Sequence, residues 1–325
     1  DCGSDFKDID PYRAGVIMGC GIGGIGLTLE QHSKYLEKGP GRMSVFYVPM
    51  MIGNMAAGTI SMKTGFKGAN FCTTTACASS THAIGEAFRK IKDGYLDVCI
   101  AGGAEACVSE FALGGFNNMK ALTRSDDLTR CSIPFDKERN GFVLGEGSGM
   151  LVLEELEHAK ARGAKIYAEI RGCGNTDDAY HVTAPHPEGR GAIACMKQAI
   201  TEAGINPSDI GYINAHGTAT NKGDTVETSS IKKVFGNTLP YVSSTKGATG
   251  HMMGAGGITE TITCVKAIET GTVPPTINLN EVDPECAGID FVANTAKKAE
   301  INFAMSNAFG FGGQNSSIIV GKYGK

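Results

Sequence analysis

The chain alternates short, β-branched apolar segments that end in or near glycine with longer segments of helical character. Short continuous apolar runs separated by helices are typical of buried, mostly parallel strands in α/β proteins. The sequence therefore predicts an α/β fold. The expected strands are Ala14 to Gly19, Asp97 to Gly102, Gly149 to Glu154, Tyr167 to Gly172, Ile210 to Ala215, Tyr241 to Ser244, Phe303 to Ser306 and Ser316 to Gly321.

Four predicted helices fall into two classes. Ala78 to Asp93 and Gly254 to Thr270 carry small or apolar residues on nearly every side, which predicts helices buried inside the protein. Glu154 to Arg162 and Gly191 to Ala203 are charged and amphipathic, so we expect them on the outside.

The pattern restarts near position 165, where a strand and a charged helix are followed by a new strand. We therefore predict two halves, residues 1–164 and 165–325. Each half holds a strand, a glycine-rich motif and a buried helix, which hints at an internal duplication. Because no long polar linker separates the halves, we expect them to pack as one body.

Composition excludes several kinds of function. Thirty Lys and Arg against 34 Asp and Glu leave a net charge of −4, so no positive field attracts nucleic acid. The 11 cysteines show no CxxC spacing, which indicates reduced thiols. The sequence also lacks the HExxH motif that would indicate a metal site. The longest apolar stretch, Gly15 to Leu29, is too short and glycine-rich to cross a bilayer, which predicts no membrane insertion.

A glycine-rich motif, GCGIGGIG at residues 19–26, follows the first predicted strand. It contains the GxGxxG pattern of dinucleotide-binding folds. Such folds also need an acidic residue about 20 positions later, at the end of a second strand, and none occurs here. The favoured interpretation is a tight turn from strand to helix.

Cys77 stands in TTTACASST, between a β-prone run and a helix of small residues. A cysteine at a helix N-terminus is favoured as a thiolate by the helix dipole and free N–H groups. Cys77 is therefore a candidate nucleophile, and the alternative is a buried structural cysteine.

Two histidines also follow predicted strands. His216 lies in NAHGTAT, and His251 lies with Lys246 in SSTKGATGHMMGAGG. Each could be an ordinary core histidine, but two such residues and a helix-terminal cysteine together favour catalysis. A glycine-rich loop, SNAFGFGGQN at 306–315, separates the last two strands and has backbone N–H groups that could face a ligand.

Taken together, these motifs resemble the β-ketoacyl-[acyl-carrier-protein] synthases of the thiolase superfamily, in particular the elongating type II enzymes. The resemblance also includes IPFDKERNGFVLGEGSGMLVLEELEHAKARGA at 133–164 and DAYH at 178–181. It implies a duplicated thiolase-like fold, layered α-β-α-β-α, with two mixed five-stranded sheets around buried helices.

The resemblance also implies roles for individual residues. Cys77 would be the acylated nucleophile, His216 and His251 the catalytic histidines, and Lys246 the motif lysine. The backbone N–H groups of Cys77 and Phe311 would form the oxyanion hole, with Glu260 in support. The implied substrate contacts are Ile22, as the gate of the acyl pocket, Tyr47, Phe116, Thr218, Thr220 and Phe309. Arg42 and Lys120 would dock the carrier, with Arg124 and Arg130 extending the basic patch.

The implied reaction is a decarboxylative condensation of a malonyl thioester with a Cys-bound acyl chain, an acyltransferase activity that needs no cofactor and no metal. The implied partners are acyl carrier protein and a second copy of the chain, in a cytoplasm of bacterial type, with a plastid location left open. A polyketide or aryl-polyene ketosynthase of the same fold is an alternative. A degradative thiolase is a weaker one, because that family uses a second cysteine near the C-terminus and no cysteine follows Cys286.

Three positions depart from the family pattern. Asn221 stands where proline is usual after HGTxT, and Tyr47 stands where phenylalanine is common in the acyl pocket. The family pattern also begins upstream of Asp1, so we expect the first sheet to lack a strand.

Overall fold

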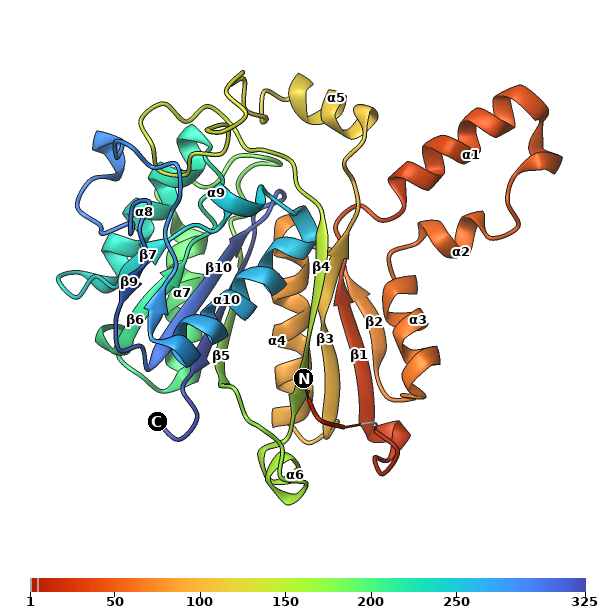
Figure 1. Cartoon of the computed structure of the whole chain (residues 1–325), viewed down its shortest axis with the longest axis horizontal. Coiled ribbons are helices and arrows are strands. Elements are labelled where there is room, and N and C mark those ends of the chain that lie inside the picture. The colour runs from red at the N-terminus through yellow and green to blue at the C-terminus, as the bar shows by residue number, and fades with distance from the viewer. Residues whose placement is uncertain (1, 5) are drawn as a thin grey trace.

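Two buried helices form the centre of the molecule. The computed structural model describes residues 2–4 and 6–325. Helices α4 (Ser79–Lys92) and α10 (Gly256–Thr270) pack against each other between two sheets (Figure 1). A Cβ on Gly257 would lie 1.9 Å from Thr81 Oγ1, so the helices approach closely because this position is glycine.

The N-terminal sheet has the strand order β2-β1-β3-β4. Strands β1, β2 and β3 run parallel, and β4 is antiparallel to β3. Helix α3 (Met55–Thr64) packs against β1 and β2. The four strands are β1 (Ala14–Gly19), β2 (Asn70–Thr73), β3 (Val98–Glu105) and β4 (Gly147–Glu154). The resemblance implied five strands in this sheet, and the described residues supply four.

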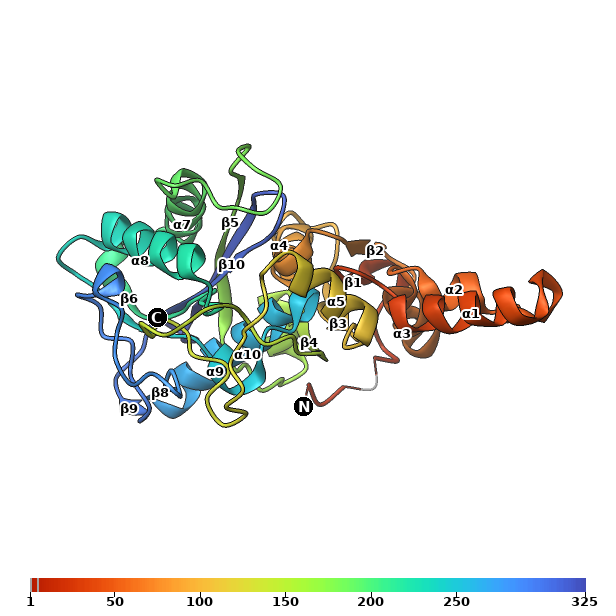
Figure 2. The same ribbon diagram turned by 90° about the horizontal axis from the view of Figure 1, so that it is seen from above.

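The C-terminal sheet has the order β5-β11-β10-β6-β7. Helices α7 (Arg190–Ala203) and α8 (Asn221–Phe235) lie on its outer side, which completes the layers α-β-α-β-α (Figure 2). The five strands are β5 (Glu169–Asp177), β6 (Ile210–Asn214), β7 (Tyr241–Ser243), β10 (Phe303–Phe309) and β11 (Gln314–Gly321). The short strands β8 (Thr272–Val273) and β9 (Lys297–Lys298) form a separate pair.

The two sheets repeat one arrangement. Strands β1, β2, β3 and β4 occur in the same chain order and with the same relative directions as β6, β7, β10 and β11. A short 3-10 helix precedes each central helix: η3 (Ala76–Ala78) before α4 and η5 (Met253–Ala255) before α10. Each begins with a residue of positive φ, 48° at Ala76 and 47° at Met253. The duplication thus extends to the turns that precede the helices, and the boundary at 164/165 stays a prediction.

An arm projects from the N-terminal half (Figures 1 and 2). It consists of α1 (Ile25–Lys38), η2 (Pro40–Arg42) and α2 (Tyr47–Met51), and it leads into α3. The remaining helices are α5 (Glu110–Asn118), α6 (Leu156–Ala161), α9 (Lys246–Thr249), η1 (Pro11–Arg13), η4 (Pro207–Asp209) and η6 (Pro284–Cys286). In the described part of the chain, no helix is both long and apolar enough to cross a membrane.

Candidate active site

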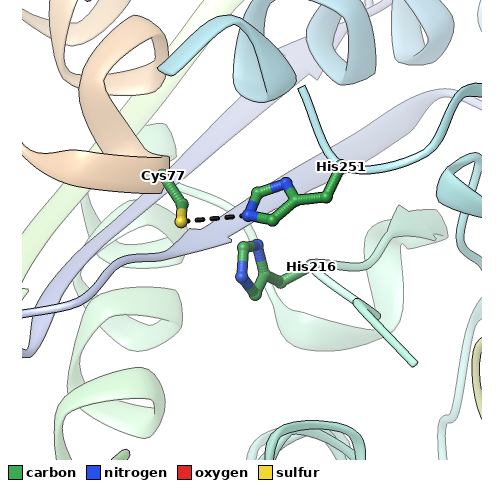
Figure 3. A group of neighbouring side chains, drawn as sticks. All are labelled: Cys77, His216 and His251. Carbon is green, nitrogen blue, oxygen red and sulfur yellow. Dashed lines mark hydrogen bonds between the residues drawn. The ribbon is translucent and has the colours of Figure 1, made fainter. Parts of the chain in front are cut away.

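Cys77 lies in η3, directly before the buried helix α4. The 48° φ of Ala76 turns the chain sharply between β2 and this helix. The Cys77 side chain is only 4% exposed, and its Sγ lies 3.0 Å from Nε2 of His251 (Figure 3). The two buried helices are thus preceded by turns that bring a thiol and an imidazole into direct contact.

Burial dominates the protonation of Cys77. It raises the pKa of the thiol to about 11, while the positive charge of Lys246 and the backbone N–H groups of Phe311 and Cys77 act in the opposite direction. The backbone N–H groups at this helix N-terminus favour the thiolate, but desolvation outweighs them and the charge of Lys246. At neutral pH the thiol keeps its proton, and His251 is the adjacent acceptor.

The two histidines meet at the same point from different elements. His216 follows β6 and His251 follows α9, and their ring centroids are 5.3 Å apart at an interplanar angle of 89°. Burial and the charge of Lys246 hold the pKa of both well below the ordinary histidine value, so both are neutral at pH 7. Neither Nδ1 has a hydrogen-bond partner among the described residues.

Lys246 supplies the positive charge behind the histidines. It begins α9, is 2% exposed and forms a buried ion pair with Glu260 on α10. Burial raises the pKa of Glu260 above its ordinary value, and Lys246 opposes that shift. The ion pair holds the Lys246 ammonium group where its charge lowers the pKa of both imidazoles.

The loop from β10 to β11 closes over the thiol. A Cβ on Gly310 would lie 2.8 Å from the carbonyl oxygen of Thr75 and 3.2 Å from the Cys77 nitrogen. Only glycine permits this approach, which brings the N–H of Phe311 toward the sulfur. Phe309 lies with its ring centroid 5.9 Å from that of His216.

A cavity of about 350 Å³ leads to these groups. Among its walls are Cys77, His216, His251, Thr218, Thr220, Phe309, Phe311 and Lys120. The hydroxyls of Thr218 and Thr220 lie 3.0 Å apart, just before α8. Phe116 lies beside this cavity, where its ring packs edge-on against Phe142 with centroids 5.5 Å apart.

Three of the expected residues lie elsewhere in the single chain. Tyr47 begins α2 on the arm, where its hydroxyl is 3.5 Å from that of Thr28. Arg42 ends η2, also on the arm (Figure 1), whereas Lys120 follows α5 and lines the cavity. Ile22 lies in the turn after β1 and does not line the cavity, although this turn approaches η3: a Cβ on Gly21 would lie 3.4 Å from the Ala76 carbonyl oxygen.

The two arginines expected to extend the docking patch, Arg124 and Arg130, lie in different surroundings. Arg130 is held in ion pairs with Asp136 and Glu138, so it is not a free cation. Arg124 is exposed.

Two buried carboxyl groups of α8, Glu227 and Asp224, were not predicted from the sequence. Glu227 accepts hydrogen bonds from the backbone N–H groups of His216 and Gly217, at 2.9 and 2.8 Å. Asp224 accepts one from Phe135 at 2.8 Å. Burial raises the pKa of Glu227 to about 7 and that of Asp224 to about 6. Their spacing of three residues, which places both on one helix face, was the available signal.

The Cys77, His216 and His251 ligand atoms lie within 4.8 Å of one another, a spacing that a transition metal could also use. The buried ammonium group of Lys246 is close enough to depress the pKa of both histidines. A fixed positive charge opposes a metal cation at the same point. The arrangement suits thiol chemistry better than metal binding.

The two halves of the chain match two family models: residues 1–159 match the β-ketoacyl synthase N-terminal domain, and residues 167–280 match the C-terminal domain. The chain belongs to the β-ketoacyl synthase family. It is 49% identical to 3-oxoacyl-[acyl-carrier-protein] synthase 2 of Synechocystis over 98% of this chain and 77% of the relative. It is 47% identical to the Staphylococcus aureus protein of the same name, over 99% of this chain and 78% of the relative.

Solved structures agree with this assignment. A β-ketoacyl synthase from Burkholderia phymatum superposes with a TM-score of 0.91 at 36% identity, over 97% of this chain and 77% of that one. A type II polyketide ketosynthase, solved with its acyl-carrier protein and bound to a hexaketide, superposes with a TM-score of 0.91 at 32% identity. The match covers 97% of this chain and 79% of the ketosynthase chain. The fold of this β-ketoacyl synthase is therefore the thiolase-like fold that the motifs implied.

Proposed function

We propose that this β-ketoacyl synthase condenses malonyl thioesters with a Cys77-bound acyl chain, with loss of CO2, during fatty acid elongation on acyl carrier protein. The observation that carries the proposal is the 3.0 Å contact between the Cys77 thiol and a neutral His251. A second neutral imidazole, His216, faces the same space. Its 49% identical relative is named for this reaction.

In the first half-reaction, the thiol proton moves to Nε2 of His251 as sulfur attacks the acyl thioester. The N–H groups of Cys77 and Phe311 stabilise the tetrahedral oxyanion. The carbon–sulfur bond to the carrier then breaks, and the carrier thiolate takes the proton back from His251. The products are acyl-Cys77 and free carrier thiol.

In the second half-reaction, malonyl thioester loses CO2, and the electron pair of the broken carbon–carbon bond forms an enolate. Once Cys77 is acylated it no longer donates to His251, whose ring can then carry its proton on Nε2, so that His216 and His251, both neutral, donate hydrogen bonds to the enolate oxygen. The enolate carbon attacks the acyl-Cys77 carbonyl, the carbon–sulfur bond to Cys77 breaks, and the Cys77 thiolate takes a proton from solvent water. Phe309 and Phe311 exclude water that would hydrolyse the acyl-enzyme.

The substrate arm of the carrier fits the cavity that leads to Cys77. Thr218 and Thr220 line this cavity and offer hydroxyl groups to the amides of a pantetheine arm. Lys120 lines the same cavity and meets the acidic carrier protein. Neither half-reaction requires an oxidant, a metal or an organic cofactor.

The working form that we propose is a homodimer. Strand β2 is an edge strand, and an unpaired edge invites a second chain. The arm presents large apolar side chains to solvent, among them Leu36, Val45, Phe46, Val48 and Met50 at 56–87% exposed. An isologous pairing would cover both features and bring Tyr47 and Arg42 toward the partner's cavity.

A polyketide ketosynthase is the second candidate. It is supported by the fold that this chain shares with the type II polyketide ketosynthase, on which it superposes with a TM-score of 0.91. The curated relatives named for 3-oxoacyl synthesis are more similar in sequence, at 46–49% identity against 32%. These relatives are bacterial and all 11 cysteines are free, which supports the cytoplasm as the location.

The test is reconstitution with purified acyl-loaded and malonyl-loaded carrier protein. We expect one β-ketoacyl carrier product and one CO2 per turnover, without added cofactor. Chain growth by repeated condensation without reduction would support the polyketide alternative, and thioester hydrolysis alone would contradict both.

A further inference from the structure

Glu105, at the end of β3, has a buried carboxylate that neither half-reaction uses. It is 4% exposed. Its Oε2 accepts hydrogen bonds from the backbone N–H groups of Gly21 at 2.7 Å and Gly254 at 3.1 Å. Its Oε1 accepts one from Ile22 N–H at 3.1 Å and lies 3.5 Å from the Cys20 thiol.

These contacts join two segments around the catalytic centre. Residues 20–22 form the turn after β1 that carries Ile22, and Gly254 lies in η5, three residues after His251. Burial and the Glu105 charge raise the pKa of Cys20 to about 12, so its thiol stays a donor to the carboxylate. A Cβ on Gly254 would lie 2.7 Å from Glu105 Oε2, which shows how tightly the carboxylate is enclosed.

The repeated fold supplies an independent comparison. Strand β1 ends at Gly19 and its counterpart β6 ends at Asn214, so Gly21 and Ile22 correspond to His216 and Gly217. Glu227 holds the N–H groups of His216 and Gly217. In both halves, a buried carboxylate therefore binds the same two backbone amides after the first strand, although the two acids come from different elements.

We propose that Glu105 is a positioning residue that fixes the turn bearing Ile22 against the segment bearing His251, and so sets which acyl chains reach Cys77. This inference rests on the proposed function and on the expectation from the family resemblance that Ile22 gates the acyl pocket. Glu105 acts through the backbone of the turn and touches no substrate. Since an uncompensated misplacement of about 1 Å can cost roughly a hundredfold in rate, a fixed turn matters for acyl transfer.

The test variant is Glu105→Gln, which keeps the side-chain volume but turns an NH2 group toward backbone N–H donors. The matched control is Glu146→Gln, an exposed carboxylate that accepts a single bond from Val108 N–H. Two rates are measured for each: acyl transfer to Cys77 from octanoyl and palmitoyl pantetheine thioesters, and malonyl decarboxylation.

We expect Glu105→Gln to change the palmitoyl-to-octanoyl ratio by roughly tenfold or more while decarboxylation stays within about threefold of wild type. Hydrogen exchange of the segment 20–25 should become faster in Glu105→Gln and stay unchanged in Glu146→Gln. Because exchange is measured for residues 20–25 alone, it separates a loosened turn from a general loss of stability in Glu105→Gln.

An unchanged ratio, an equal fall of both rates, or unchanged exchange would each overturn the role of Glu105. The variant Ile22→Phe separates this outcome from failure of the proposed function. If Ile22→Phe shifts the ratio and Glu105→Gln does not, only the Glu105 inference is wrong. If the wild-type protein forms no acyl-Cys77 with either thioester, the proposed function itself is wrong.

Discussion

At the scale of single residues, burial sets the charge state of the site. It raises the pKa of the Cys77 thiol to about 11 and lowers the pKa of His216 and His251 well below the ordinary value. The resting site therefore holds a protonated thiol beside neutral imidazoles, with the ammonium group of Lys246 behind them. In the proposed mechanism, acyl transfer needs a proton to cross the 3.0 Å from sulfur to His251, whereas the enolate needs only hydrogen-bond donors.

Replacing His216 and replacing His251 should therefore lower the rates of the two half-reactions to different extents. His216→Ala should lower malonyl decarboxylation by about a hundredfold or more, the usual cost of losing one oxyanion donor, and lower acyl transfer far less. His251→Ala should lower both, because His251 alone contacts Cys77. The half-reactions are followed by CO2 release and by mass spectrometry of the acyl-enzyme, with His158→Ala, whose ring contacts Glu154, as the control. Equal losses of both half-reactions in His216→Ala would contradict the division of roles.

The sequence motifs were sufficient to nominate Cys77, His216 and His251: the two histidines follow predicted strands, and Cys77 stands between a β-prone run and a predicted helix. They could not reveal Glu105 or Glu227. A carboxylate that binds backbone N–H groups leaves no side-chain motif in the sequence. Gly21 lies 84 residues from Glu105, and His216 lies 11 residues from Glu227. Only the folded arrangement shows which acids are buried.

At the scale of elements, the loop between β10 and β11 depends on one close approach. In Gly310→Ala the new Cβ would meet the Thr75 carbonyl oxygen and the Cys77 nitrogen, so the N–H of Phe311 should move away from the oxyanion position. We expect kcat to fall by about 10²–10³ with the fold retained. Gly26→Ala, where nothing lies within 4 Å of the new Cβ, is the matched control. Near-normal kcat in Gly310→Ala would exclude this loop from the oxyanion hole.

All eight predicted strands are found, and β1 has the predicted bounds. Strand β5 extends to Asp177 instead of ending at Gly172, because it pairs with β11 along its whole length and its glycines pack against α7. The β-prone run before Cys77 overlaps a further strand, β2 (Asn70–Thr73), which was not among the eight predicted. The arm was not predicted, since its apolar residues face no core within the chain that could impose a clear pattern.

At the scale of the whole molecule, the exposed apolar arm should be buried in a dimer. The double variant Phe46→Asp with Val48→Asp should sediment as a monomer and lose most activity, because charges on both sides of Tyr47 would enter the interface. Leu128→Asp is the control, since Leu128 is 88% exposed but lies outside the arm. A wild-type protein that sediments as a fully active monomer at assay concentration would refute the dimer.

Carrier docking should depend on Lys120, which lines the cavity, and on Arg42, which lies on the arm. Lys120→Glu and Arg42→Glu should each raise KM for the carrier-bound substrate and spare a small pantetheine thioester. The effect should shrink with salt, because at 0.1 M the Debye length is about 10 Å. Lys322→Glu, exposed near the C-terminus, is the control. An unchanged KM for the carrier substrate at low ionic strength would place the docking surface elsewhere.

Mass spectrometry after incubation with acyl-carrier thioester tests most directly whether Cys77 carries the acyl chain. We expect one acyl adduct per chain on the peptide containing Cys77. We also expect Cys77→Ala to form no adduct, to keep its fold and to lose condensation by about 10⁴-fold or more. An adduct on another cysteine, or condensation at the normal rate by Cys77→Ala, would contradict the assignment of Cys77 as the acylated nucleophile.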